Sequence, residues 1–129
     1  MADVVRLIVP AQARHVRLVR LTAAGVATDA GLDVDDVEDL RIAVSELFAL
    51  LVDEDESDDE IEVVYRQRDH AVSIEGRRVL RHGGAGPAPH PDDLALDILR
   101  VIVDEHRFKA DSEERRFELL KRAAPSHQG

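Results

Sequence analysis

The segment from Val37 to Leu51, V-E-D-L-R-I-A-V-S-E-L-F-A-L-L, is the most regular stretch of the sequence. Its apolar residues recur at alternating intervals of three and four: Val37, Leu40, Val44, Leu47 and Leu51. This spacing places them on one face of an α-helix. Asp35, with Glu38 three residues later, predicts a capping box at the helix start. The segment is therefore predicted to be a helix with one buried face.

Glu46 is a carboxylate set among apolar residues of this helix. Its neighbours at helical spacing cannot pair with it: Ile42, Ala43, Ala49 and Leu50. Such a carboxylate either lies at the rim of the buried face, where it reaches solvent, or has a chemical role. The spacing alone leaves both interpretations open.

The composition limits what the protein binds. Its 129 residues suit a single domain, and the core is expected to consist of Leu, Val, Ile and Ala because aromatic residues make up 3% of the chain. A net charge of −10 argues against nucleic acid and favours a basic partner. Without cysteine, a transmembrane-length apolar run or a signal-peptide pattern, the chain is expected to be cytoplasmic, with no membrane contact. The histidines are scattered singly, so no metal site is expected.

The first third of the chain is predicted to form a strand and a helix. Residues 4–9 are a short β-branched run that ends at Pro10, which indicates a strand at an edge or an end. Residues 13–30 carry a helical apolar stripe, and Arg17 and Arg20 lie outside that stripe. Gly31 follows as a candidate C-cap.

The middle of the chain is predicted to form a hairpin between two loops. The acidic run from Asp53 to Glu60 is expected to be an exposed loop, and it lacks the ligand spacing of an EF-hand. Residues 61–66 and 72–75 alternate like two hairpin strands with one buried face. Residues 76–91 are expected to be loop, and their glycines lack the Lys and Ser/Thr of a phosphate-binding P-loop.

The last third is predicted to contain a helix and two strands. Residues 92–105 form a strongly apolar helix that is expected to be covered on most sides. Two strands, 107–110 and 115–121, are expected on either side of a polar turn. Residues 123–129 are predicted to be a disordered tail.

The order of these elements indicates the fold class. A strand, two helices, a hairpin, a helix and two strands contain more strands than crossover helices, and the hairpin is antiparallel. We therefore predict one α+β domain over residues 1–122, a two-layer sandwich in which helices cover one face of a mixed β-sheet.

Three segments resemble a known family. They are P-A-x-x-x-x-V-x-x-V-R-L-T-x-x-G-V-A from Pro10, E-D-L-x-I-A-V-S-E ending at Glu46, and L-A-L-D-I-L-R-V-I-V-D-E from Leu94. Together they are similar to the anti-sigma factor and serine kinase family of the RsbW type. The resemblance implies the Bergerat ATP-binding fold, which gyrase and histidine kinases share. It also implies a homodimer that keeps a sigma factor from RNA polymerase, and in many members Mg-ATP-dependent phosphorylation of a serine on an anti-anti-sigma partner.

The first nucleotide motif of that family is degraded here. Glu46 matches the residue that acts as general base in ATP-hydrolysing relatives. Leu50 stands where the family has the Asn that holds Mg²⁺, and Glu54 stands where it usually has a His. Magnesium requires oxygen ligands, and a leucine supplies none.

The remaining nucleotide motifs are degraded as well. The family's D-x-G-x-G box, which reads adenine, becomes I-E-G-R-R, so Glu75-Gly76 is a faint echo of it. The lid before the third helix reads H-P-D-D-L-A-L and has lost its glycines, whose amides would wrap phosphates. The Gly-Thr pair before the last strand reads E-R-R, at residues 114–116.

Two hypotheses follow from the resemblance and its departures. The first is an anti-sigma factor without a cofactor, in which Glu46 is a relic and Arg17 and Arg20 contact the partner. The second is a divergent serine/threonine kinase that uses Mg-ATP on an anti-anti-sigma factor. The missing Asn and Asp favour the first. A scaffold that binds only an anti-anti-sigma domain is a third interpretation.

Overall fold

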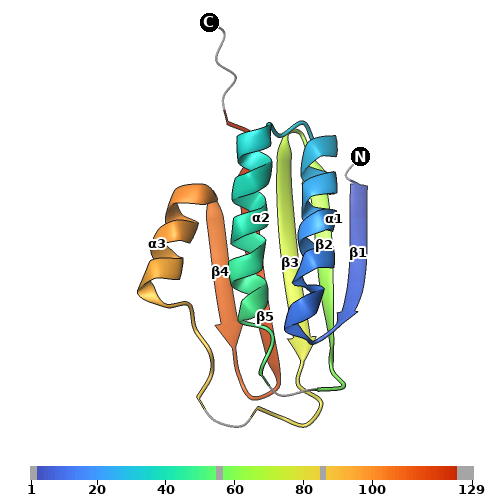
Figure 1. Cartoon of the computed structure of the whole chain (residues 1–129), viewed down its shortest axis with the longest axis vertical. Helices are drawn as coiled ribbons and strands as arrows, with labels where there is room; N and C mark the ends of the chain where they lie inside the picture. The colour runs from blue at the N-terminus through green and yellow to red at the C-terminus, as the bar shows by residue number, and fades with distance from the viewer. Residues whose placement is uncertain (1–2, 55–56, 85–86, 125–129) are drawn as a thin grey trace, which may run out of the picture.

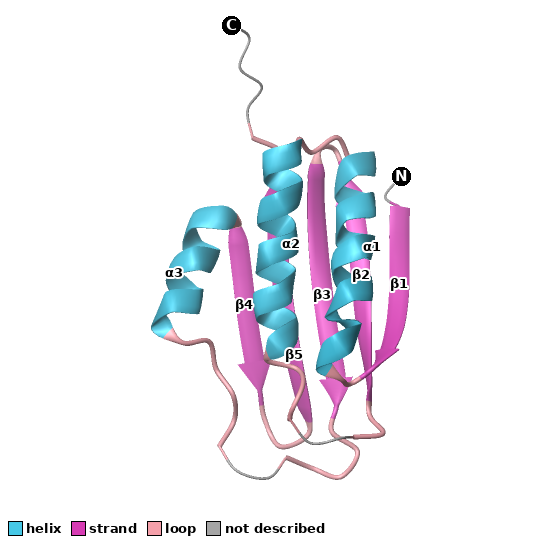
Figure 2. Ribbon diagram, in the orientation of Figure 1, coloured by secondary structure: helices cyan, strands magenta, loops and turns pink. Residues whose placement is uncertain are grey.

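A five-stranded sheet and a layer of three helices make up the computed structural model, which describes residues 3–54, 57–84 and 87–124 (Figure 1). In chain order the elements are β1 (Asp3–Pro10), the short 3-10 turn η1 (Ala13–His15), α1 (Val16–Asp29), α2 (Val34–Ala49), β2 (Glu60–Arg68), β3 (Ala71–Val79), α3 (Asp93–Ile102), β4 (Glu105–Ala110) and β5 (Glu114–Arg122). All three helices lie on one face of the sheet (Figure 2). The predicted α+β two-layer class is confirmed.

The sheet is antiparallel throughout, although a mixed sheet was expected. The strand order is β1-β2-β3-β5-β4, and each neighbouring pair described is antiparallel. The connections explain this arrangement. The helix pair α1 and α2 returns the chain to the end at which β1 stopped, so β2 runs back along β1. The single crossover through α3 leaves space between β3 and β4, and β5 fills it.

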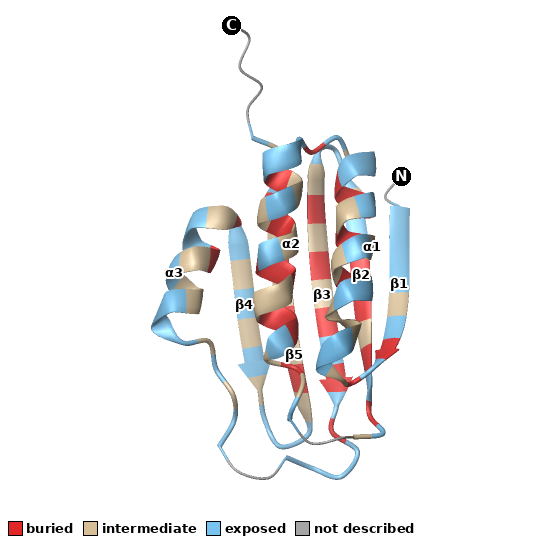
Figure 3. Ribbon diagram, in the orientation of Figure 1, coloured by how far each residue is buried: buried red, intermediate tan, exposed pale blue. Residues whose placement is uncertain are grey.

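The core lies between the two layers and follows the alternation of the strands (Figure 3). In β3, Val72 and Ile74 face the helices, and in β5 Phe117 and Leu119 do so. The largest fully buried side chain is Tyr65 of β2, whose hydroxyl donates a hydrogen bond of 2.9 Å to the carbonyl oxygen of Val19 in α1. Burial raises the pKa of the Tyr65 phenol well above its usual range.

Two helix ends test the predicted caps. Gly31 has φ of 90° and ends α1, and Leu32 N–H donates to Ala27 O at 3.0 Å, so the predicted C-cap glycine is confirmed. The predicted cap of α2 is wrong by two residues. Asp33, not Asp35, caps the helix by accepting a 2.8 Å hydrogen bond from Asp36 N.

Gly76 was expected to begin a loop, but β3 continues to Val79. Gly76 lies inside the strand on its buried face, where a Cβ atom would overlap the ring of Phe117. Glycine is present because the neighbouring aromatic ring needs the space.

The third helix is shorter and more exposed than predicted. Of its residues Leu99 is buried, whereas Leu94 is 70% and Val101 83% exposed. The expectation that this helix is covered on most sides is therefore wrong. It packs against α2 and β4 at one side of the helix layer (Figure 1).

The chain end was predicted to be disordered from residue 123, but two of those residues are hydrogen-bonded. Ala123 N–H donates to His70 O at 2.7 Å, and Ala124 N–H donates to a carboxylate oxygen of Asp36 at 2.9 Å. The rest of the predicted tail, 125–129, lies outside the described residues. Among the helices of the described ranges, none is long and apolar enough to cross a membrane.

Candidate functional site

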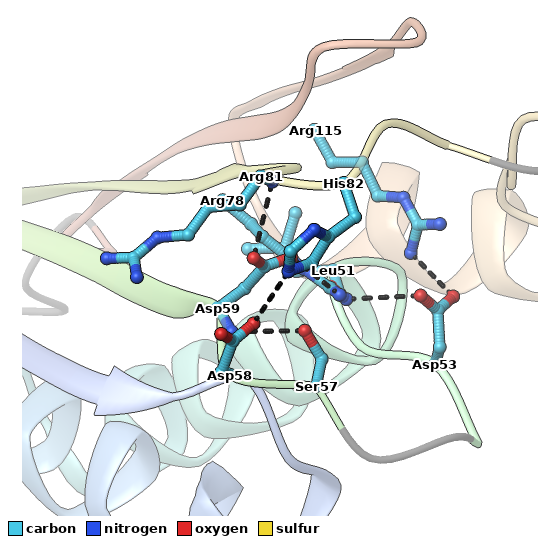
Figure 4. Close-up of polar contacts among 9 residues, drawn as sticks. All are labelled: Leu51, Asp53, Ser57, Asp58, Asp59, Arg78, Arg81, His82 and Arg115. Atoms are coloured by element: carbon cyan, nitrogen blue, oxygen red, sulfur yellow. Dashed lines mark hydrogen bonds and ion pairs between the residues drawn. The ribbon is translucent and has the colours of Figure 1, made fainter.

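Three chain segments that the sequence resemblance aligns with nucleotide motifs come together at one end of the molecule. The chain after α2, the end of β3 and the start of β5 meet around the side chain of Arg78 (Figure 4). Period-two alternation continues in β3 from Val72 through Gly76, so Arg78 is directed to the buried face, under the end of α2.

All three guanidinium nitrogens of Arg78 contact acceptors, and 4% of its side chain is exposed. Its Nε and Nη2 atoms each lie 3.0 Å from Oδ2 of Asp59, a carboxylate that is equally buried. Its Nη1 atom donates to the carbonyl oxygen of Leu51 at 2.8 Å. That carbonyl lies two residues past the last residue of α2, and the dipole of the helix favours a cation near this end.

Asp53 joins a second arginine to this group. One of its oxygens lies 3.3 Å from Nη1 of Arg78, and the other accepts a 2.9 Å hydrogen bond from Nη1 of Arg115 in β5. We call Asp53, Asp59, Arg78 and Arg115 the ion-pair cluster. It connects the end of α2, the start of β2, the end of β3 and the start of β5.

The cluster determines the protonation of Asp59. Burial disfavours its charged form, but hydrogen bonds from the Arg78 side chain and the Arg81 N–H, together with the charge of Arg78, outweigh burial and hold the pKa of this carboxyl below its usual range. Asp59 was expected in an exposed loop. It is buried instead because Arg78 is its partner.

A cavity of ≈ 690 Å³ opens beside the cluster. Its wall includes further carboxylates, Glu54 and Asp58, and Asp58 is 3.3 Å from Nε2 of His82. The two arginines of the cluster are matched by two aspartates, so the additional carboxylates make this cavity acidic. In the part of the chain that the structure describes, no three His, Asp or Glu side chains form a group that could hold a metal ion.

Glu46 and Leu50, which the sequence analysis singled out, do not belong to the cluster. Glu46 is half-buried, and no hydrogen bond or ion pair with another described residue holds its carboxylate. Leu50 is half-buried and packs against the core, and Leu51 after it is fully buried. Of the family's first motif, Glu54 alone lines the cavity.

Arg17 and Arg20 lie in the first turns of α1, at the end of the helix layer where α2 stops (Figure 1). Arg17 is exposed, and Arg20 is half-buried. The Nε atom of Arg20 is buried and has no hydrogen-bond partner among the described residues. It therefore retains an unused donor.

Arg78, Arg115 and Asp59 were missed by the sequence analysis, although a signal for the arginines was present. Extending the alternation of β3 past Gly76 places Arg78 on the buried face, and the alternation of Phe117 and Leu119 places Arg115 there too. Two buried cations require buried or shared carboxylates, and the acidic run before β2 supplies them.

Sequence comparison with known proteins identifies the family of this chain. No protein-family model matches the sequence. The serine-protein kinase RsbW of Bacillus thuringiensis (strain Al Hakam) is 32% identical over 120 residues, which cover 80% of this chain and 75% of that protein. This chain belongs to the RsbW family. A second RsbW, from Bacillus cereus (strain AH187), is 40% identical over 120 residues, with the same coverage of 80% and 75%.

The RsbW fold is also found among solved structures. The crystal structure of the RsbU and RsbW domains of Rv1364c from Mycobacterium tuberculosis superposes with a TM-score of 0.67 at 17% identity, covering 93% of this chain. This chain spans about a third of that longer one, because the match covers 32% of it. The match supports the Bergerat-type fold that the sequence resemblance implied.

Proposed function

We propose that this RsbW-family chain is an anti-sigma factor that sequesters a sigma factor from RNA polymerase without using ATP. The observation that carries the proposal is the ion-pair cluster. It lies where the family's nucleotide motifs converge, and there the chain's own side chains satisfy the charges. The side chain of Leu50 offers no oxygen to magnesium, and Leu50 directly precedes Leu51, whose carbonyl oxygen accepts from Arg78.

The cluster and the nucleotide would compete for the same groups. A triphosphate binds favourably to guanidinium groups, but Arg78 and Arg115 already form ion pairs with Asp59 and Asp53. Binding of a triphosphate to Arg78 would leave the buried carboxylate of Asp59 without its cation, which costs free energy. The acidic residues Glu54 and Asp58 on the cavity wall would also repel phosphate.

The second candidate is a serine kinase that acts on an anti-anti-sigma factor. Two observations favour it: Glu46 is retained, and the relatives at 32% and 40% identity are named serine-protein kinases. A kinase needs a magnesium site, however, and the residues at the end of α2 do not fit one. We therefore retain it as the alternative.

Leu50→Asn separates the two candidates. In an anti-sigma factor without a cofactor, the variant should gain no affinity for Mg-ATP, because the lid glycines and the adenine-reading Asp are also missing. It should lose about 1–2 kcal/mol of unfolding free energy, because an amide replaces a half-buried leucine. Calorimetric titration with Mg-ATP and thermal melts with and without nucleotide measure both effects.

Ala49→Asn is the matched control, because Ala49 is exposed at the last position of α2. Its stability should change by at most about 0.5 kcal/mol. A low-micromolar dissociation constant for Mg-ATP in the wild type, or a melting point of Leu50→Asn raised by Mg-ATP, would make the kinase the better description.

Binding of a sigma factor should depend on the first turns of α1. On co-expression with the sigma factors of the source genome, one of them should co-purify with the wild type. Arg17→Ala and Arg20→Ala should each weaken that complex about tenfold or more, since an interfacial arginine often contributes at least 1.4 kcal/mol. Arg68→Ala, an exposed arginine at the far end of β2, is the control. Failure of every sigma factor to co-purify would contradict the proposal.

We also propose a homodimer joined along β1 or α1. β1 is an edge strand of the sheet, and its Val4 and Ile8 are 49% and 58% exposed. An exposed apolar edge needs a cover. Sedimentation should give about twice the 14.3 kDa of one chain, and Ile8→Lys should shift the protein to monomer. Val101→Lys, at a position 83% exposed on α3, should leave the dimer intact.

A further inference from the structure

The exposed side of α3 carries an apolar stripe whose two end residues the described chain leaves open to solvent. Leu94 and Val101 are 70% and 83% exposed, and half-buried Ile98 lies between them at helical spacing. Residues at intervals of four and three lie along one side of a helix. We call Leu94, Ile98 and Val101 the α3 stripe.

The stripe is bordered by negative charge. Asp93 and Asp97, both exposed, lie four residues apart next to it on the helix surface. Segment 92–105 contains five carboxylates and one guanidinium, a formal charge of −4. That guanidinium, Arg100, is already paired with Asp97 at 3.4 Å.

The helix that presents the stripe is firmly anchored. Leu99 packs into the core, and Asp92 caps the helix start by accepting a hydrogen bond from Ala95 N at 2.8 Å. At the other end, Nζ of Lys121 donates to Ile102 O at 2.7 Å. A partner would therefore meet a surface that is already ordered, which reduces the entropy lost on binding.

We infer that the α3 stripe is a docking surface for a basic amphipathic helix of a protein partner. Such a helix would pack its apolar residues on Leu94, Ile98 and Val101 and set its Lys or Arg residues against Asp93 and Asp97. This surface is separate from Arg17 and Arg20, because α2 lies between α1 and α3 (Figure 2). The inference holds whether or not the partner is a sigma factor.

The charge pattern selects this occupant over two others. In a second copy packed antiparallel on α3, Asp97 would oppose its own counterpart, and two like charges facing each other across an interface repel. An anionic lipid surface would be repelled by Asp93 and Asp97. A basic helix meets neither obstacle.

The test uses a synthetic peptide of two L-K-K-L-K-K-K repeats, whose leucines lie along one side when it is helical, and a scrambled peptide of the same composition. The full chain should bind the first peptide, and binding should shift the amide resonances of α3. Leu94→Ser combined with Val101→Ser should weaken binding about tenfold or more by fluorescence anisotropy. Asp93→Asn combined with Asp97→Asn should weaken it as well.

The control variant makes the same kind of substitution, from an exposed apolar residue to serine, on a different helix. Leu18→Ser combined with Leu21→Ser removes two leucines of α1 that are 47% and 66% exposed, and it should leave peptide binding unchanged. Equal binding of the scrambled peptide, or shifts spread over the acidic surface, would overturn the inference. So would a dimer that Leu94→Ser and Val101→Ser dissociate, or binding to phosphatidylglycerol vesicles that the same variants abolish.

Discussion

Arg78→Met is expected to lower the free energy of unfolding by about 3–5 kcal/mol, because it breaks a buried ion pair. The methionine keeps much of the side-chain volume but leaves Asp59 buried without its cation, and it leaves Leu51 O without its donor. Urea or thermal unfolding measures the loss. Arg77→Met, at the next position of β3 on the solvent face, removes an exposed pair with Glu114 and should leave the stability nearly unchanged.

A double variant and a change of pH show whether the lost ion pair is the cause. Arg78→Met combined with Asp59→Asn should recover part of the loss, because the uncompensated charge is gone. In the wild type the pKa of Asp59 is lowered, so its contribution is complete above about pH 4 and is lost as the pH falls through the folded-state pKa.

In Arg78→Met the pH dependence of stability that Asp59 causes should have the opposite sign. Without the guanidinium, burial raises the pKa of Asp59, and the folded variant then loses stability as the pH rises above about 4. The difference between wild type and variant should therefore be larger at neutral pH than at acidic pH. An equal difference at both would show that packing, and not charge, accounts for the loss.

Gly76→Ala is expected to destabilise the protein by about 1–3 kcal/mol through overpacking, because the new methyl group would overlap the ring of Phe117 across the β3–β5 pair. Combining it with Phe117→Leu should recover part of that loss, since the smaller side chain leaves room for the methyl group. The double variant should then unfold at a higher urea concentration than Gly76→Ala alone.

Gly25→Ala is a control that should increase the stability, whereas Gly76→Ala should decrease it. Gly25 lies inside α1, and a Cβ atom there would meet nothing within 4 Å. Alanine should stabilise the helix by about 0.5–1 kcal/mol, because the unfolded chain loses freedom and no contact is strained. A loss of stability at both glycines would argue against a specific clash with Phe117.

The fold could be predicted from the sequence wherever burial imposes a period on apolar residues. The helical spacing from Val37 to Leu51 and the strand alternation around Ile61 and Val72 both mark faces that the structure buries. The start of α2 could not be read in this way. Its first residue, Val34, is 84% exposed, so the apolar pattern begins one turn after the helix does.

The candidate site was less predictable, because its residues lie in surroundings that are unusual for their residue types. Gly76 suggested a loop, yet it makes room for a ring that lies 41 positions later in the chain, at Phe117. The charges of Arg78 and Asp59 predicted exposed positions, yet each side chain is buried because the other neutralises its charge. Such mutual compensation depends on contacts between distant segments, and periodicity within one segment does not report them.

Tyr65 gives this protein a single intrinsic optical probe. The sequence contains one tyrosine and no tryptophan, so its near-ultraviolet absorbance and emission come almost entirely from this ring. The ring is fully buried at the contact between β2 and α1, where its hydroxyl is bonded to Val19 O. In alkali the phenol should ionise only once the helix layer separates from the sheet. Phenolate absorbance therefore follows the loss of tertiary structure in the unlabelled, unsubstituted chain.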